Sequence, residues 1–100
     1  MAGYSRKTVL GPSEILERAH ADLPHRLGLT RTRSSGHGAT YSGKEGTVTV
    51  SAHRHSQYTV VTTSTDQLRT SRMDYEIQRF LNLMPYEHGD EGGRGEGDPN

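Results

Sequence analysis

The feature that most constrains the fold is a run of alternating side chains in the second half of the chain. Residues 47–52 read Thr-Val-Thr-Val-Ser-Ala, and residues 57–65 are rich in β-branched side chains, which favour strands. Successive side chains of a strand point to opposite faces, so this alternation predicts strands with one buried face. The polar stretch between them, which contains His53 and His55, is interpreted as the end of a hairpin.

The alternation of side chains with a period of two, typical of strands, begins earlier in the chain, at Leu29. The predicted strands are joined by short connections, as in an antiparallel meander, and cover residues 29–34, 38–42, 47–53 and 57–65. The tetrapeptide Gly43-Lys44-Glu45-Gly46 is a suitable hairpin connection. A short extended piece is expected earlier, from Lys7 to Leu10.

Two helices are predicted. The first begins near Pro12, ends at Gly28, and has its apolar residues at helical spacing: Ile15, Leu16, Ala19, Leu23 and Leu27. Pro24 should kink or split this helix, because it lacks an N–H and clashes with the preceding turn. The second helix begins with a Ser71/Asp74 capping box and ends at Pro85. Its apolar stripe consists of Met73, Ile77, Phe80, Leu81 and Met84.

The predicted fold class is α+β, with the order β-α-β-β-β-β-α. A four- to five-stranded antiparallel sheet would bury one face under both helices. The other face would carry Thr47, Thr49, Ser51 and the threonines of the following strand. The element order resembles that of a reduced helix-grip fold, in which a curved sheet wraps a long C-terminal helix. Residues 1–85 are predicted to form one small domain. The Gly- and acid-rich residues 86–100 are predicted to be a flexible tail, disordered when free.

The composition indicates a thin core and an uneven distribution of charge. Leu, Ile, Val and Phe number only 16 of the 100 residues, although the formal net charge is zero. Residues 1–72 carry ten Lys and Arg against five Asp and Glu, a balance of +5, and residues 73–100 carry two against seven, a balance of −5. Either the acidic end neutralises its own domain, or the two parts offer two surfaces to two partners.

The absence of cysteine excludes disulfides and Cys-ligated metal centres, and it favours a reducing, cytoplasmic location. The N-terminal sequence has no apolar segment typical of a signal peptide. No apolar run approaches the roughly 18 residues needed to span a bilayer. We therefore expect a soluble or peripheral protein, and peripheral association with a membrane complex is compatible with this expectation.

Histidine is a common metal ligand, and the chain contains six: His20, His25, His37, His53, His55 and His88. Pairing Ala39 with Val50 places His37 opposite Ala52, on the core side, whereas His53 points to the other side. A one-residue slip that united them would turn the apolar set outward. No metal site is therefore predicted, and His20 and His25 are interpreted as surface residues.

Motifs for catalysis or cofactor binding are missing. No Gly-x-Ser-x-Gly elbow, positioned pair of carboxylates or phosphate-binding glycine loop occurs, so neither an enzyme nor a cofactor is predicted. Arg31 and Arg33 are expected on one strand face, where they could contact phosphates. However, stacking aromatics are scarce and the net charge is zero, so the nucleic-acid signal is weak.

Protein interaction is the remaining class of function. The sequence predicts a non-catalytic accessory or structural subunit that docks on a larger protein assembly. The predicted contact residues lie on the outer sheet face and edge and in the tail: Arg31, Arg33, Thr47, Thr49, Tyr86, Glu87, Asp90 and Glu91. Two alternatives stay open: a small ligand-binding domain with a pocket between the sheet and the C-terminal helix, and a weak nucleic-acid-binding domain.

Overall fold

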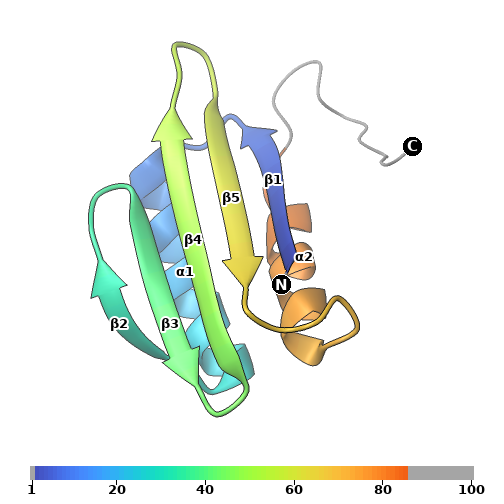
Figure 1. Ribbon diagram of the computed structural model, residues 1–100. Coiled ribbons are helices and arrows are strands. Elements are labelled where there is room, and N and C mark those ends of the chain that lie inside the picture. The colour runs from blue at the N-terminus through green and yellow to red at the C-terminus, as the bar shows by residue number, and fades with distance from the viewer. Residues whose placement is uncertain (1, 86–100) are drawn as a thin grey trace.

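The computed structural model describes residues 2–85 and contains a five-stranded antiparallel sheet with two helices, as predicted. Figure 1 shows both helices behind the sheet, so that the chain forms two layers. The elements are, in chain order, β1 (Ala2–Thr8), α1 (Pro12–Leu27), β2 (Thr30–Ser34), β3 (Gly38–Gly43), β4 (Gly46–Arg54), β5 (Thr59–Thr65) and α2 (Arg72–Asn82). The predicted tail residues 86–100 lie outside the described part of the chain.

The order of strands across the sheet is β1-β5-β4-β3-β2, and every neighbouring pair is antiparallel. The predicted register between β3 and β4 is confirmed, because Ala39 pairs with Val50 and Tyr41 with Val48. The first strand begins five residues earlier than the expected piece at Lys7 to Leu10 and ends at Thr8, and it pairs with β5 along its whole length. The first strand of the chain therefore forms one edge of the sheet, and β2 forms the other.

The helices share one face of the sheet and divide it between them. The longer helix, α1, packs mainly on β3 and β4, whereas α2 packs mainly on β5 and β1. With 16 residues in α1 and 11 in α2, the sheet does not wrap a long C-terminal helix, and the likeness to a helix-grip fold is limited to element order. Neither helix has both the length and the apolar content needed to cross a membrane.

One hydrophobic cluster lies between the two layers. It contains every residue of both predicted helical stripes, together with Leu29 and the core-facing residues of the sheet: Ala39, Tyr41, Val48, Val50, Ala52 and Val61. Among these, Tyr41 and Phe80 are the largest side chains that are almost completely buried. The helical periodicity of the sequence thus identified the helical half of the core correctly.

Threonines complete the core, which corrects the prediction that the threonines of β5 face outward. Thr59, Thr63 and Thr65 are buried on the helix side of the sheet, because they pair with Arg54, Val50 and Val48 of β4. The sequence of β5 contains adjacent Val-Val and Thr-Thr pairs, so alternation cannot distinguish its two faces. A threonine methyl group can pack in a core while its hydroxyl bonds locally.

The helices differ from the predictions in the effect of Pro24, in the role of Asp74 and in the end of α2, which lies at Asn82, three residues before Pro85. Pro24 does not split α1, and its carbonyl accepts the backbone N–H groups of Gly28 and Leu29 at the C-terminal end. Gly28 adopts the left-handed conformation of a C-cap, at φ 64°. At the start of α2, the Ser71 hydroxyl accepts the N–H of Asp74, as expected, whereas the Asp74 carboxylate bonds to Tyr4 and Gln78.

Candidate functional site

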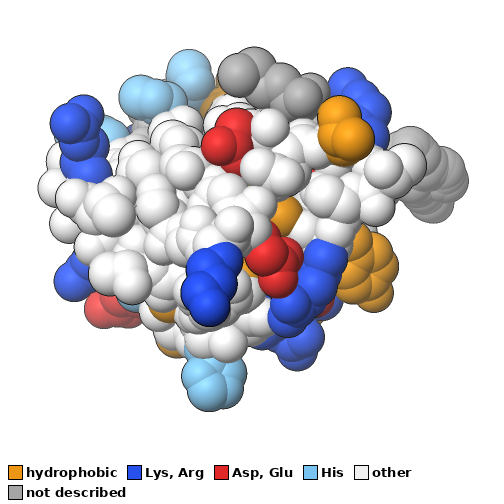
Figure 2. Space-filling view, turned by 60° about the horizontal axis from the view of Figure 1, so that its bottom comes forward, with side chains coloured by type: hydrophobic (Ala, Val, Ile, Leu, Met, Phe, Trp, Pro, Cys, Tyr) orange, Lys and Arg blue, Asp and Glu red, His pale blue; other side chains and the backbone are white. Residues whose placement is uncertain are grey.

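The outer face of the sheet, opposite the helices, is covered by no other described element. We use this name for the residues that alternate with the core-facing ones: Gly3, Ser5, Lys7, Thr30, Arg33, Gly38, Thr40, Ser42, Thr47, Thr49, Ser51, His53, Val60, Thr62 and Ser64. Most are short hydroxyl side chains. In the oblique view of Figure 2, the left part of the surface is a broad white area of backbone and of side chains that are neither hydrophobic nor charged, with histidines above it and basic side chains at the left margin.

All charged side chains in the strands are basic. The five strands contain no Asp or Glu, and they contain five basic residues: Arg6, Lys7, Arg31, Arg33 and Arg54. The acids among residues 2–85 lie instead in the helices and in the turns that follow β3 and β5. The ion pairs of this part of the chain involve Arg18, Arg26, Arg72 and Arg79, so neither Arg31 nor Arg33 is paired within it.

A β-bulge separates Arg31 from Arg33, which corrects the prediction that the two share a strand face. Arg31 pairs with Tyr41, whereas Arg33 pairs with Thr40, so Thr32 is an extra residue on β2. Residues directly opposite each other in a sheet lie on the same face. Arg31 therefore lies on the helix side, beside Tyr41, and Arg33 lies on the outer face.

A depression of about 230 Å³ opens on the outer face next to Arg33. We call it the Arg33 depression; it is lined by Arg33, Ser34, Ser35, Gly38, Ala39, Thr40, Thr49, Val50 and Ser51. Short side chains leave this space, and Gly38 contributes because a Cβ atom there would lie 3.0 Å from the Val50 carbonyl oxygen. No acidic residue contributes to the lining.

A second depression, of about 180 Å³, lies at the other end of the outer face. Its lining includes Thr47, Thr49 and Asp66. The Asp66 carboxylate accepts the Thr47 N–H at 3.0 Å, and this hydrogen bond lowers the pKa of Asp66. The two predicted contact residues Thr47 and Thr49 therefore lie side by side on one face, and Thr49 borders both depressions.

The histidines near the β4–β5 connection are closer to one another than predicted. The rings of His37 and His53 are stacked, with centroids 6.2 Å apart, which corrects the expectation that the sheet separates them. His37 precedes the first residue of β3 and is exposed, so the strand pleat does not determine the direction of its side chain. Residues 2–85 contain no group of three or more His, Asp or Glu side chains that could hold a metal ion.

His20 is not a simple surface residue, because its Nδ1 atom hydrogen-bonds to the hydroxyl of Tyr41. Tyr41 is completely buried, and burial raises the pKa of its phenol to about 12, against a smaller opposing effect of Arg31. Burial lowers the pKa of His20, and the Arg31 charge lowers it further. A core tyrosine thus satisfies its hydroxyl through a helix residue, which is an ordinary structural role.

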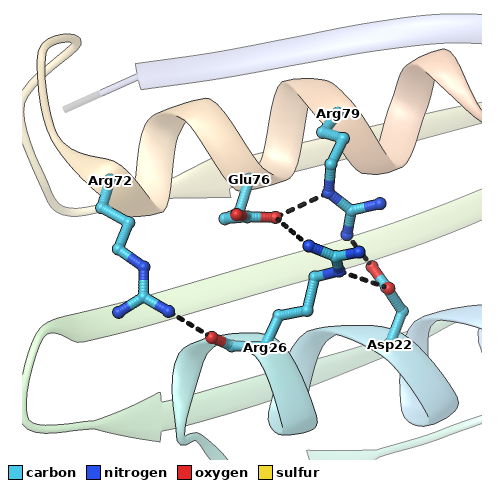
Figure 3. Close-up of polar contacts among 5 residues, drawn as sticks. All are labelled: Asp22, Arg26, Arg72, Glu76 and Arg79. Carbon is cyan, nitrogen blue, oxygen red and sulfur yellow. Dashed lines mark hydrogen bonds and ion pairs between the residues drawn. The ribbon is translucent and has the colours of Figure 1, made fainter.

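A network of charged side chains joins the two helices (Figure 3). Arg79 on α2 binds Glu76 at 2.6 Å and Asp22 on α1 at 2.5 Å, while Arg26 approaches both acids at 4.0 and 3.3 Å. These bonds raise the pKa of Arg79, although its partial burial has the opposite effect. Each charge has an opposite partner, and the network accordingly stabilises the packing of α1 against α2.

A second polar group connects β1 to α2. The Tyr4 hydroxyl donates to the buried Asp74 carboxylate at 2.7 Å, and burial together with this carboxylate raises the pKa of Tyr4. A cleft of about 150 Å³ lies beside it, lined by Tyr4, Ser5, Arg6, Gln78, Leu81 and Asn82. This volume is below the roughly 300 Å³ at which ligand pockets begin, so the cleft does not favour the alternative of a ligand-binding domain.

Of the predicted contact residues, Arg33, Thr47 and Thr49 meet on the outer face, and Arg31 lies on the opposite side of the edge strand. Tyr86, Glu87, Asp90 and Glu91 lie outside the described residues. The alternation of residues 47–52 already predicts Ser51 on this face, although not among the contact residues. No signal in the sequence indicates that Gly38 helps to form the Arg33 depression.

Comparison with known proteins assigns no family. The chain matches no protein-family model, and no curated protein shows significant similarity to it.

Proposed function

We propose that this protein is a non-catalytic accessory subunit that docks on a larger protein assembly through the outer face of its sheet. One observation carries the proposal: five strands present a face that no other described element covers, and Arg33 on this face forms no ion pair with an acid among residues 2–85. A wet sheet face is common among antiparallel sheets and does not by itself indicate a partner. The segregation of charge supports one here, because the acids of the described chain lie in helices and turns instead of among the strands.

The shape of the face also supports docking of a protein. Its side chains are short, so a partner can approach the strands closely, and its two depressions can accept protruding side chains. In protein interfaces, a few anchored side chains supply most of the binding energy, while flat surroundings exclude water. We include Thr47, Thr49 and Arg33 among the contact residues, and the acid-rich residues Tyr86, Glu87, Asp90 and Glu91 as a second contact segment.

Affinity purification from the native source tests this proposal. Thr47→Lys/Thr49→Lys places two long charged side chains on the outer face, and Ser13→Lys/Ala21→Lys adds the same charge at exposed positions of α1. We expect stable partners to be retained by the wild type and by the α1 variant, and to be lost from the outer-face variant. Circular dichroism and urea unfolding establish that both variants are folded.

If the outer-face variant retained the same partners as the wild type, docking through this face would be wrong. Steep salt-dependent retention of the wild type on a polyanion column, with no protein partner, would favour the nucleic-acid alternative instead. A co-purified small molecule seen by native mass spectrometry would favour the ligand-binding alternative.

A further inference from the structure

The Arg33 depression has the polar groups of a binding site that are not used within the described chain. No hydrogen bond or ion pair among residues 2–85 engages the side chains of Arg33, Thr49 or Ser51. By contrast, Arg79 and Arg72 bind acids, and Thr47 bonds to Ser42. Arg33, Thr49 and Ser51 therefore lie together with unused polar groups at the end of the outer face next to the bulged edge strand.

The charge at this place has a single sign. Arg33 supplies a permanent positive charge at the rim, and the stacked pair His37 and His53 lies beside the depression, because His37 precedes Gly38 and His53 follows Ser51 by two residues on the same face. Imidazole rings can donate hydrogen bonds and can also accept a proton near neutral pH. No Asp or Glu lines the depression, so an incoming anion meets no like charge there.

We infer that the Arg33 depression binds a side-chain carboxylate from an acidic segment of a protein partner, with Arg33 as the principal contact. A guanidinium presents two parallel N–H groups that match one carboxylate, and the hydroxyls of Thr49 and Ser51 can donate to its remaining lone pairs. This inference rests on the proposed function in one respect: the carboxylate is taken to belong to a protein partner.

A carboxylate suits the depression better than a phosphate. Phosphate sites typically gather several backbone N–H groups at a glycine-rich loop or helix N-terminus, and here the depression is formed on strands whose N–H groups belong to the sheet ladder. One guanidinium neutralises one carboxylate, whereas a phosphate group would keep part of its charge unpaired. The lining accordingly matches a singly charged ligand group.

The bulge in β2 supplies a matched control for the test. Arg31→Gln and Arg33→Gln remove the same charge from the same exposed strand, two residues apart, but from opposite faces of the sheet. A fluorescein-labelled hexaglutamate peptide serves as the probe, with a hexaglutamine peptide as the neutral control. Binding to the full chain is followed by fluorescence anisotropy at low ionic strength and by amide chemical shifts.

We expect Arg33→Gln to weaken hexaglutamate binding roughly tenfold, as loss of a charged hydrogen bond does, and Arg31→Gln to leave binding within about twofold of the wild type. The largest shifts should occur at residues 33–40 and 49–53. Equal weakening by both variants would overturn the site, because it would indicate attraction to net charge alone. Tighter binding of inorganic phosphate than of acetate at the same residues would overturn the choice of a carboxylate.

The outcomes also separate this inference from the proposed function. If native partners are lost from the Thr47/Thr49 variant but hexaglutamate does not bind, the docking face stands and the carboxylate site is wrong. If hexaglutamate binds through Arg33 but no protein partner depends on the outer face, the carboxylate site stands and the proposed assembly role is wrong.

Discussion

One buried threonine, Thr63, lowers the stability of the core, because its hydroxyl has no hydrogen-bond partner among the described residues. The Thr63 hydroxyl is buried and has no hydrogen-bond partner in the described structure, whereas the Thr65 hydroxyl accepts the N–H of Gln67 at 3.2 Å. An unsatisfied buried hydroxyl costs about 1–3 kcal/mol of stability. Thr63 and Thr65 lie on the same strand and face, so the main difference between them is whether the hydroxyl has a hydrogen-bond partner.

We therefore predict that Thr63→Val raises the free energy of unfolding by about 1 kcal/mol, because valine keeps the shape and removes the unpaired hydroxyl. Thr65→Val should lower it, since the N–H of Gln67 would lose its acceptor. Urea unfolding followed by circular dichroism measures both. A Thr63→Val protein less stable than the wild type would show that this hydroxyl has a partner.

The charged network between the helices gives a second prediction. Arg79→Met should lower the free energy of unfolding by about 2 kcal/mol, because it leaves the mostly buried Glu76 carboxylate without its closest partner. Arg18→Met is the control: its ion pair with Glu14 is exposed and should contribute about 0.5 kcal/mol or less. Similar losses for both variants in urea unfolding would show that the network adds nothing beyond a surface pair.

Tyr41 predicts how stability changes in alkali. Its pKa is about 12 in the folded chain against 10.0 for an unburied tyrosine, so the unfolded state releases its proton first as pH rises. The stability that Tyr41 contributes is therefore complete below about pH 10 and is lost as pH approaches 12. The raised pKa of Tyr4 acts in the same direction.

Tyr41→Phe should cost about 1 kcal/mol at neutral pH, through the lost hydrogen bond to His20, and should make the alkaline decrease in stability shallower. Urea midpoints measured from pH 7 to pH 11 give this slope. Tyr75→Phe is the control, because Tyr75 is 65% exposed and should leave the slope unchanged. Equal flattening in both variants would contradict a special role for burial at Tyr41.

Among the elements, β2 is the one in which a bulge, and not the pattern of its side chains, determines which residues face outward. All five of its residues are exposed, so no buried side chain holds its register, and the extra residue Thr32 determines which arginine faces outward. Deleting Thr32 should restore regular pairing and change the free energy of unfolding by no more than about 1 kcal/mol, because no core contact is lost. Amide hydrogen exchange and NOEs between Arg33 and Thr40 would check the pairing; loss of the β2–β3 pairing would contradict it.

The elements also show what could be predicted from the sequence and why the rest could not. Both helices and the β3–β4 register follow from apolar spacing, because burial imposes a period that the residues must obey. The bulge in β2 was missed because its sequence is uniformly polar and carries no such period. The orientation of β5 was missed because Thr and Val have nearly the same shape, and the His37–His53 contact because His37 lies outside a strand.

For the whole molecule, the pairing of β1 with β5 joins the beginning of the described chain to its middle and end. Tyr4 bonds to Asp74, and Arg6 donates to the Met84 carbonyl at 3.1 Å. A chain without residues 1–8 should therefore lose cooperative unfolding, since β5 would become an unpaired edge with its buried threonines uncovered. Calorimetry would test this, and a retained two-state transition would show that β1 is dispensable.

The distribution of charge among the described residues affects how the protein meets a partner. The cations that lie on the outer face are Lys7 and Arg33, and the acids of residues 2–85 lie in the helices and in the turns. Near an acidic surface, the attraction of these cations turns the outer face toward that surface before any contact is made. Fewer random orientations then have to be sampled, and association becomes faster without any gain in the lifetime of the complex.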